Sequence, residues 1–174
     1  GQTGLLQGAR YGIPLDAIRD DYMVGELEHD IWRAWEEERP DVIVVEGQGS
    51  ISHPVYVCGT RAILSAAKPH GVVIQHAPGR KLRRYRREEL ALPMPDLGKE
   101  IELIEAISGS RVVAITLNHE NMSPEEVERT KEEYRERFGL PTFDVLLEGP
   151  RGVAEAVVRA IPQLSKRERE RSGQ

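Results

Sequence analysis

Short apolar runs alternate along this chain with longer segments of mixed polarity. The apolar runs are rich in β-branched residues and cover 42–45, 72–75, 112–117 and 143–147. Uninterrupted apolar runs of this length are typical of strands buried on both faces of a parallel sheet. The longer segments predict helices over 21–38, 60–67, 98–108, 123–138 and 151–161.

The fourth predicted helix has the clearest end signals. Ser123 suits the N-cap, Pro124 the first helical position, and Glu126 completes a capping box, while Gly139 ends the helix. Because strands and helices alternate strictly, we predict a doubly wound α/β fold with a mainly parallel sheet.

Polar loops follow three of the predicted strands, and they begin with Glu46, His76 and Asn118. Since the carboxyl ends of parallel strands share one edge of the sheet, we expect these loops to converge on a ligand site. Gly47 and Gly49, which follow Glu46, would let the backbone approach a ligand closely.

Glu46 is the first candidate for a general base or a metal ligand. Mg²⁺ takes one or two carboxylates together with phosphate oxygens, and Asp21 or its neighbour Asp20 is expected to supply the second carboxylate. The alternative is that Glu46 pairs with an arginine and that both aspartates only cap their helix.

Histidines are the next candidates, because imidazole titrates near neutral pH and suits proton transfer. His53 follows the glycines after Glu46, and His76 and His119 stand at the other two strand ends. Each could instead be a structural hydrogen-bonding group or a metal ligand. A zinc site is not favoured, since no two histidines are spaced i, i+4.

Six cations lie between Arg80 and Arg87. Beside a ligand edge they would attract a phosphate or an anionic substrate, and we expect Arg80 to bind it directly. The alternative is a solvated segment that faces the acidic region 88–105. At the other end of the sequence, Gly1-Gln2-Thr3-Gly4 predicts a tight loop whose amides and hydroxyl could hold a phosphate or carboxylate.

Length and composition limit the function classes. A chain of 174 residues suits one domain, over 1–164, followed by a charged tail at 165–174. The net charge of -5 argues against a nucleic-acid partner. The sequence has no apolar run of the ~18 residues that a membrane span needs. The single cysteine, Cys58, excludes an internal disulfide framework, so a reducing cytoplasm is expected.

The sequence does not begin with Met, and its first residues look like part of a motif. The sequence contains no Gly-x-x-x-x-Gly-Lys-Ser/Thr phosphate loop. We therefore expect that N-terminal sequence is missing. Five segments together resemble the C-terminal domain of a bacterial and archaeal family whose assigned activity is D-glutamate N-acetyltransferase, also called N-acetyl-D-glutamate synthase. These segments are 1–4, 12–18, 21–25, 45–56 and 76–80.

The resemblance extends to about residue 149 and implies a Rossmann-like domain followed by a P-loop-type domain similar to dethiobiotin synthetase. The expected fold is a P-loop NTPase-like three-layer sandwich, here lacking its first strand and phosphate loop. By this resemblance Glu46 and Asp21 are Mg²⁺ ligands, and Asn118 meets a purine base. The basic run is longer than the family pattern, and Tyr22 stands where Phe is expected; the basic run leaves the substrate open.

Two enzymatic hypotheses and one non-enzymatic hypothesis follow. The first is transfer of acetyl from acetyl-CoA to the amine of a small acidic amino acid, D-glutamate by resemblance, with Glu46, His53 and His76 as catalytic residues. The second is a Mg·ATP-dependent ligase or kinase-like enzyme, and the third a nucleotide-binding module without catalysis. We also expect a homo-oligomer. Expected substrate or phosphate contacts are Gly1, Gln2, Thr3, Gly47, Gly49, Ser50, Arg80 and Asn118.

Overall fold

The computed structural model describes residues 2–54, 57–83 and 92–164. The chain forms two compact units. The first unit comprises Gly1–Pro69 and Leu103–Gly109, and the second comprises His70–Glu102 and Ser110–Gln174. Gly1, the basic residues 84, 86 and 87, and the tail 165–174 lie outside the described residues, so the predictions made for them stay predictions.

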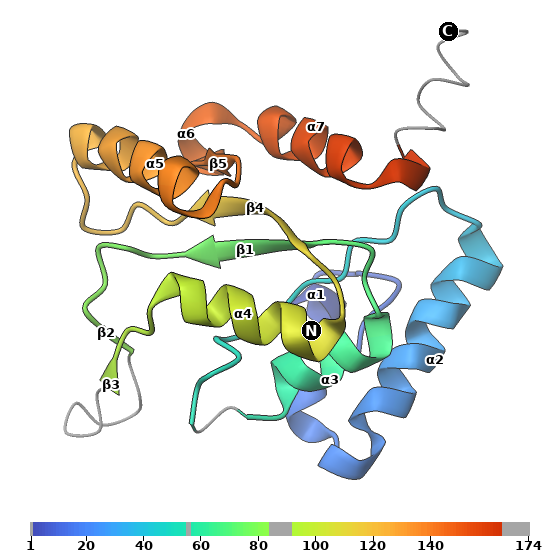
Figure 1. The fold of residues 1–174 in the computed structure, drawn as a ribbon. Coiled ribbons are helices and arrows are strands. Elements are labelled where there is room, and N and C mark those ends of the chain that lie inside the picture. Colours follow the sequence, from blue (N-terminus) through green and yellow to red (C-terminus); the bar gives the residue numbers. More distant parts are fainter. Residues whose placement is uncertain (1, 55–56, 84–91, 165–174) are drawn as a thin grey trace, which may run out of the picture. The chain divides into compact units, whose positions relative to one another are not determined.

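A parallel sheet forms the centre of the second unit. Its strands are β1 (Val72–His76), β4 (Val112–Leu117) and β5 (Thr142–Phe143), in the order β1-β4-β5 (Figure 1). Every residue of β4 except Thr116 is buried, as expected for a strand with neighbours on both sides. The predicted strands at 72–75 and 112–117 are thus confirmed, and with them an α/β fold built on a parallel sheet.

Three helices of this unit follow β4 and β5 in sequence. They are α5 (Pro124–Phe138), α6 (Val145–Glu148) and α7 (Arg151–Ala160). Helix α4 (Leu97–Ser108) has residues in both units. Helix α7 packs on β4 and β5, and α5 packs on β5 (Figure 1). A separate antiparallel pair joins β2 (Leu82–Arg83) to β3 (Leu92–Pro93).

The ends of α5 agree with the sequence prediction. Ser123 Oγ accepts from the amide of Glu126, and the Glu126 carboxylate accepts from the amide of Ser123, so the capping box is complete. Gly139 ends the helix at a φ of 64°, in the left-handed region that favours glycine.

The first unit is helical. It contains α1 (Gln2–Leu6), the 3-10 helix η1 (Leu15–Ala17), α2 (Asp20–Glu38) and α3 (Gly59–Ala67). Helix α2 packs on α3. Their shared core is made of Leu15, Met23, Ala62 and Ile63, with partly buried Val45 packed against it.

Three local predictions are wrong, and the first concerns the apolar run 42–45. This run forms no strand, and Val44 is 89% exposed. A strand needs a neighbouring strand to accept and donate its backbone hydrogen bonds. The described residues of the first unit contain no other strand, so the run stays irregular and only Val45 reaches the core.

The other two corrections concern short helices. Gln2-Thr3-Gly4 begins helix α1 rather than a loop, because the amide of Gln7 returns to the carbonyl oxygens of Thr3 and Gly4. The run 143–147 leaves the sheet after Phe143, because the Asp144 side chain accepts the amides of Leu146 and Leu147 and so caps α6.

Candidate functional site

The glycine-rich segment Gly47–Ser50 is fastened to the start of α3 in the first unit. Thr60 Oγ1 donates to the carbonyl oxygen of Gly49 at 2.6 Å. The amide oxygen of the Gln48 side chain lies so close to Gly59 that it would have to move if Gly59 carried a Cβ. The segment therefore lies against a helix N-terminus, where backbone amides favour anions.

Residues just beyond this segment turn back into the unit. The amide of His53 donates to the carbonyl of Ser50 at 3.0 Å, and Ser50 Oγ lies 3.2 Å from Ser52 Oγ. His53 is only 8% exposed, whereas Glu46 is exposed to solvent. Of the two predicted proton acceptors in this unit, Glu46 is thus the more accessible to a substrate.

The two aspartates at the start of α2 have partners of their own. Asp21 forms an exposed ion pair with Arg19 at 3.7 Å. Asp20 accepts a hydrogen bond from Cys58 Sγ at 3.1 Å, and this bond together with burial raises the pKa of the Cys58 thiol.

Asp21 and Glu46 carry the hard oxygen ligands that Mg²⁺ prefers. However, in the part of the chain that the structure describes, no three His, Cys, Asp or Glu side chains are grouped so that they could hold a metal ion. The described donors do not make a complete metal site, and the magnesium assignment of these two residues stays a prediction.

The loops after β1 and β4 meet in the second unit. The amide of Asn118 donates to the carbonyl of His76 at 2.8 Å, and Arg80 Nε donates to Glu120 Oε2 at 2.7 Å. A Cβ on Gly79 would collide with the backbone carbonyl of Glu120. Two of the three loops that were expected to converge are therefore in contact; the third, after Glu46, belongs to the first unit.

Two predicted binding residues are already engaged in this contact. The Arg80 guanidinium is paired with Glu120, with a second nitrogen 2.5 Å from the same carboxylate oxygen. Asn118 Oδ1 accepts the amide of Glu120 at 3.0 Å and so stabilises its own loop. A substrate anion at Arg80 would share the guanidinium with Glu120 or displace it.

His76 is held by an aromatic partner. Its Nδ1 lies 2.9 Å from the hydroxyl of Tyr134, and the rings are 5.8 Å apart. Burial lowers the pKa of His76, against the smaller opposing effect of Asp96 and Glu100, and burial raises the pKa of Tyr134 to about 12. The pair is thus a neutral imidazole beside a neutral phenol, and its first role is to hold the end of β1 to α5.

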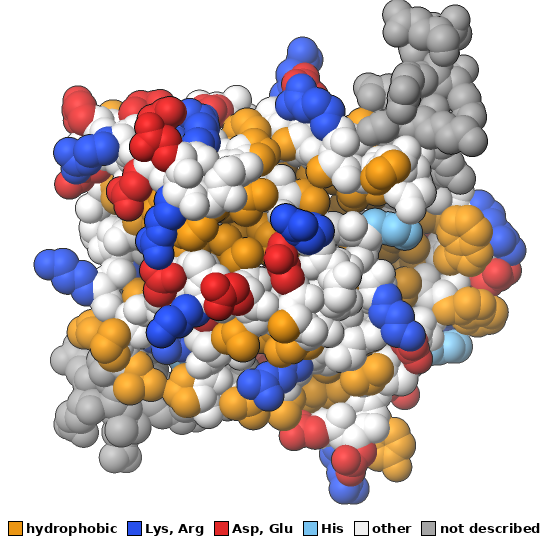
Figure 2. Space-filling view, in the orientation of Figure 1, with side chains coloured by type: hydrophobic (Ala, Val, Ile, Leu, Met, Phe, Trp, Pro, Cys, Tyr) orange, Lys and Arg blue, Asp and Glu red, His pale blue; other side chains and the backbone are white. Residues whose placement is uncertain are grey.

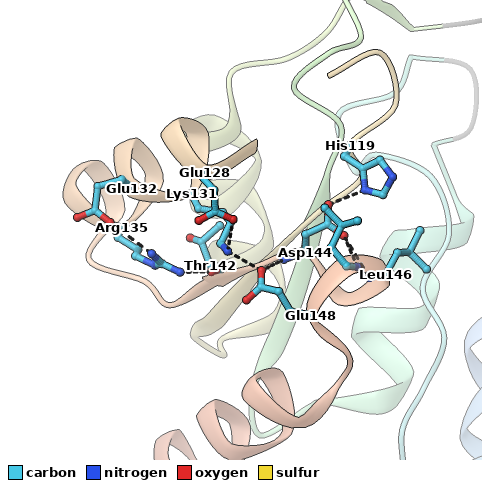
Figure 3. Close-up of polar contacts among 10 residues, drawn as sticks. His119, Glu128, Lys131, Glu132, Arg135, Thr142, Asp144, Leu146 and Glu148 are labelled. Carbon is cyan, nitrogen blue, oxygen red and sulfur yellow. Dashed lines mark hydrogen bonds and ion pairs between the residues drawn. The ribbon is translucent and has the colours of Figure 1, made fainter. Parts of the chain in front are cut away.

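Sequence reasoning missed Asp144, which follows β5. Its side chain is fully buried, and Oδ2 lies 2.6 Å from His119 Nδ1 (Figure 3). The sequence does contain a signal for this residue, because Asp144 is an acid inside the apolar run 143–147. An uncompensated carboxylate is costly inside a strand that is buried on both faces, so the acid itself indicated the end of that strand.

Lys131 and Glu148 lie on the side of Asp144 that faces away from His119 (Figure 3). Glu148 Oε1 accepts the amide of Asp144 at 2.9 Å and the ammonium of Lys131 at 2.6 Å. Desolvation alone would lower the pKa of Lys131, which is 5% exposed. Its hydrogen bonds with Glu148 and Glu128 outweigh that effect and raise the pKa.

The surface of α5 carries paired charges rather than one sign. Figure 2 shows acidic and basic side chains interspersed over this helix, and two of the pairs are Glu128–Lys131 and Glu132–Arg135. Among the described residues, the helices are all too short or too polar to cross a membrane.

Comparison with known protein families identifies the family of this chain. Residues 1–154 match the model of a family described as "Domain of unknown function (DUF1611_C) P-loop domain". The chain belongs to this family. The resemblance stated from the motifs is thereby confirmed, and DUF1611 membership agrees with the α/β fold described above.

Two curated relatives carry a functional name. "D-glutamate N-acetyltransferase" from Tritonibacter scottomollicae is 30% identical over 165 residues, which are 90% of this chain and 46% of the relative. A protein of the same name from a Pseudoalteromonas species is 31% identical over 154 residues, 86% of this chain and 44% of the relative. The chain thus spans less than half the length of these relatives.

A solved structure supports the fold. The DUF1611 family protein from Anabaena variabilis ATCC 29413 is similar with a TM-score of 0.79 and 26% sequence identity. The similarity covers 91% of this chain and 46% of that one.

Proposed function

We propose that this chain is the P-loop-type part of an N-acetyltransferase that moves acetyl from acetyl-CoA to the amine of a small acidic amino acid, with D-glutamate as acceptor. The observation that carries the proposal is the similarity to two proteins named D-glutamate N-acetyltransferase, which extends over 90% and 86% of the chain.

The reaction sets chemical requirements on the site. The amine nitrogen attacks the thioester carbonyl carbon, the carbon–sulfur bond breaks, and the CoA thiolate leaves. An amino acid binds mainly as an ammonium ion, which has no free electron pair, so a base must first remove a proton. Of the acceptors predicted in the first unit, Glu46 is exposed to solvent and His53 is buried.

The glycine-rich segment supplies the second requirement, stabilisation of negative charge. Thr60 fixes the carbonyl of Gly49 and holds the segment beside the N-terminus of α3. Amides of Gly47, Gly49 and Ser50, together with the first turn of α3, suit the oxyanion of the tetrahedral intermediate or the phosphates of CoA.

Arg80 supplies the third requirement, recognition of an acidic acceptor. Its pairing with Glu120 keeps the guanidinium in a fixed position. A substrate carboxylate would take over part of this pairing, since a guanidinium can donate to two carboxylates at once.

A Mg·ATP-dependent ligase or kinase-like enzyme is the second candidate, and the P-loop description of the matching family favours it. ATP would place its phosphates at the same glycine-rich segment of the first unit, with Asp21 and Glu46 toward the magnesium ion. Coenzyme A also contains an adenosine diphosphate, so the two candidates differ in what reacts.

The test is a direct product assay on the intact protein. Incubated with acetyl-CoA and D-glutamate, it should release CoA and form N-acetyl-D-glutamate in equal amounts, measured by thiol titration and mass spectrometry. Glu46→Gln tests Glu46 as the base: a fall of about 100-fold or more would assign the proton to Glu46, and an unchanged rate would assign it to another residue. The matched control is Asp41→Asn, five residues earlier. Calorimetric binding of Mg·ATP with no response to acetyl-CoA would favour the ligase instead.

A further inference from the structure

We propose that His119, held by Asp144, is the general base that removes the proton from the acceptor amine. This assignment rests on the proposed acetyl transfer and adds a catalytic residue to it, because the geometry at the ends of β4 and β5 is that of an oriented imidazole.

The sheet brings the two residues together. Strands β4 and β5 are parallel neighbours, with Thr116 paired to Phe143. His119 comes three residues after Thr116, and Asp144 directly follows Phe143. Both therefore stand at the carboxyl edge of the sheet, where parallel α/β folds bind their ligands. The loop after β1 also meets this edge, through the hydrogen bond between Asn118 and His76.

Hydrogen bonding fixes which ring nitrogen carries the proton. Asp144 Oδ1 accepts from the amides of Leu146 and Leu147 at 3.1 and 3.2 Å, and Oδ2 lies 2.6 Å from His119 Nδ1. A carboxylate is an acceptor only, so the hydrogen of this short bond resides on Nδ1. Nε2 of the neutral ring then has the free electron pair that a base needs.

The solvent exposure of His119 and Asp144 suits a base and the carboxylate that orients it. Asp144 is 0% exposed, whereas His119 is 33% exposed. Figure 3 shows the imidazole ring projecting beyond Asp144, away from the Lys131–Glu148 pair. The carboxylate is thus out of reach of a substrate, while the ring it orients can be approached.

Lys131 and Glu148 are positioning residues for this dyad. Glu148 holds the amide of Asp144, and the buried ammonium of Lys131 holds Glu148. Such support matters because a base that is displaced by about 1 Å loses much of its effect.

The other histidines in the loops are less suited to the task. His76 uses Nδ1 for Tyr134, and its burial favours the neutral ring but limits access. His53 is 8% exposed. In contrast, His119 combines partial exposure with a buried carboxylate on the opposite side of its ring.

The proton transfer balances without any further reactant. Nε2 of His119 takes one proton from the acceptor ammonium, and the freed amine attacks the thioester carbon. When the carbon–sulfur bond breaks, the second amine proton leaves the new amide, and the imidazolium returns its proton to the CoA sulfur. The products are the N-acetylated amino acid, free CoA and one proton released to solvent.

The first test separates catalysis from structure with His119→Asn. The asparagine side chain can donate to Asp144 as Nδ1–H does, but it contains no base. We expect kcat to fall by about 100-fold or more with KM and Tm close to the wild-type values. His70→Asn is the matched control, because His70 is an exposed histidine of the same unit, and it should leave kcat unchanged.

The second test reads the tautomer of His119 by ¹⁵N NMR of the intact protein. The wild type should show Nδ1–H and a bare Nε2. Asp144→Asn keeps an oxygen for the amides of Leu146 and Leu147 but turns an NH₂ group toward Nδ1, so the proton should move to Nε2 and kcat should fall.

Three results would overturn the assignment, and only the third would also reject the proposed function. Wild-type kcat in His119→Asn, or Nε2–H in the wild type, would reject the dyad alone. Absence of acetyl transfer by the wild type would reject both the function and the base that depends on it.

Discussion

Truncation of Asp144 should lower the stability of the second unit. Its fully buried carboxylate caps α6 through two amides and binds His119 at 2.6 Å. Loss of a cap costs ~1 kcal/mol. Loss of a hydrogen bond to a charged group costs ~1.5–3 kcal/mol.

The two contributions give the magnitude for Asp144→Ala. Because His119 is one-third exposed, water can replace part of its lost bond, so the expected loss in free energy of unfolding is about 2–4 kcal/mol. Asp144→Asn keeps an acceptor for the α6 amides and a polar group toward His119. It should therefore cost less than about 1 kcal/mol of unfolding free energy.

The assay must report on the second unit. Both tryptophans lie on α2 in the first unit, so their fluorescence follows the wrong part of the chain. Amide hydrogen exchange of β4 at increasing urea concentration measures the opening free energy of the sheet itself. Equal losses in the Ala and Asn variants, or a loss under about 0.5 kcal/mol in the Ala variant, would show that the Asp144 carboxylate does not stabilise the unit through these bonds.

Three further predictions use other parts of the structure. Burial lowers the pKa of His76 below its ordinary value of 6.5, so the unfolded state binds the proton more readily than the folded state. The unfolding free energy should therefore fall as the pH drops below 6.5. In urea titrations His76→Gln should remove this part of the pH dependence. A Cβ on Gly152 would lie 2.6 Å from Phe143 Cε1, whereas one on Gly25 meets nothing within 4 Å; Gly152→Ala should lower Tm and Gly25→Ala should raise it, and a rise in both would contradict the packing. Thr60→Val removes the bond to Gly49 and should speed amide exchange over 46–50, whereas Ser65→Ala on the exposed side of α3 should not.

Local signals predicted much of the fold. The ends of α5 follow from Ser123, Glu126 and Gly139, whose side chains or φ angles act within one turn of the helix. The buried run of β4 likewise identified the central strand of the sheet. Signals of this kind are contained in neighbouring residues, so sequence alone is enough to read them.

Features that depend on distant partners were not readable. The run 42–45 has the composition of a strand, but pairing requires a neighbour that composition does not supply. The partner of His76 is Tyr134, 58 residues away, and that of His119 is Asp144, 25 residues away. His119 was therefore not among the predicted catalytic residues, because its carboxylate partner lies far away in the sequence.

Analysis of the reaction products distinguishes acetyl transfer from an ATP-dependent reaction. The intact protein is given acetyl-CoA and D-glutamate, with L-glutamate and Mg·ATP in parallel reactions, and the products are identified by mass spectrometry. We expect N-acetyl-D-glutamate together with one equivalent of free CoA. Formation of ADP or AMP with no acetylated amino acid would show that the protein is not an acetyltransferase.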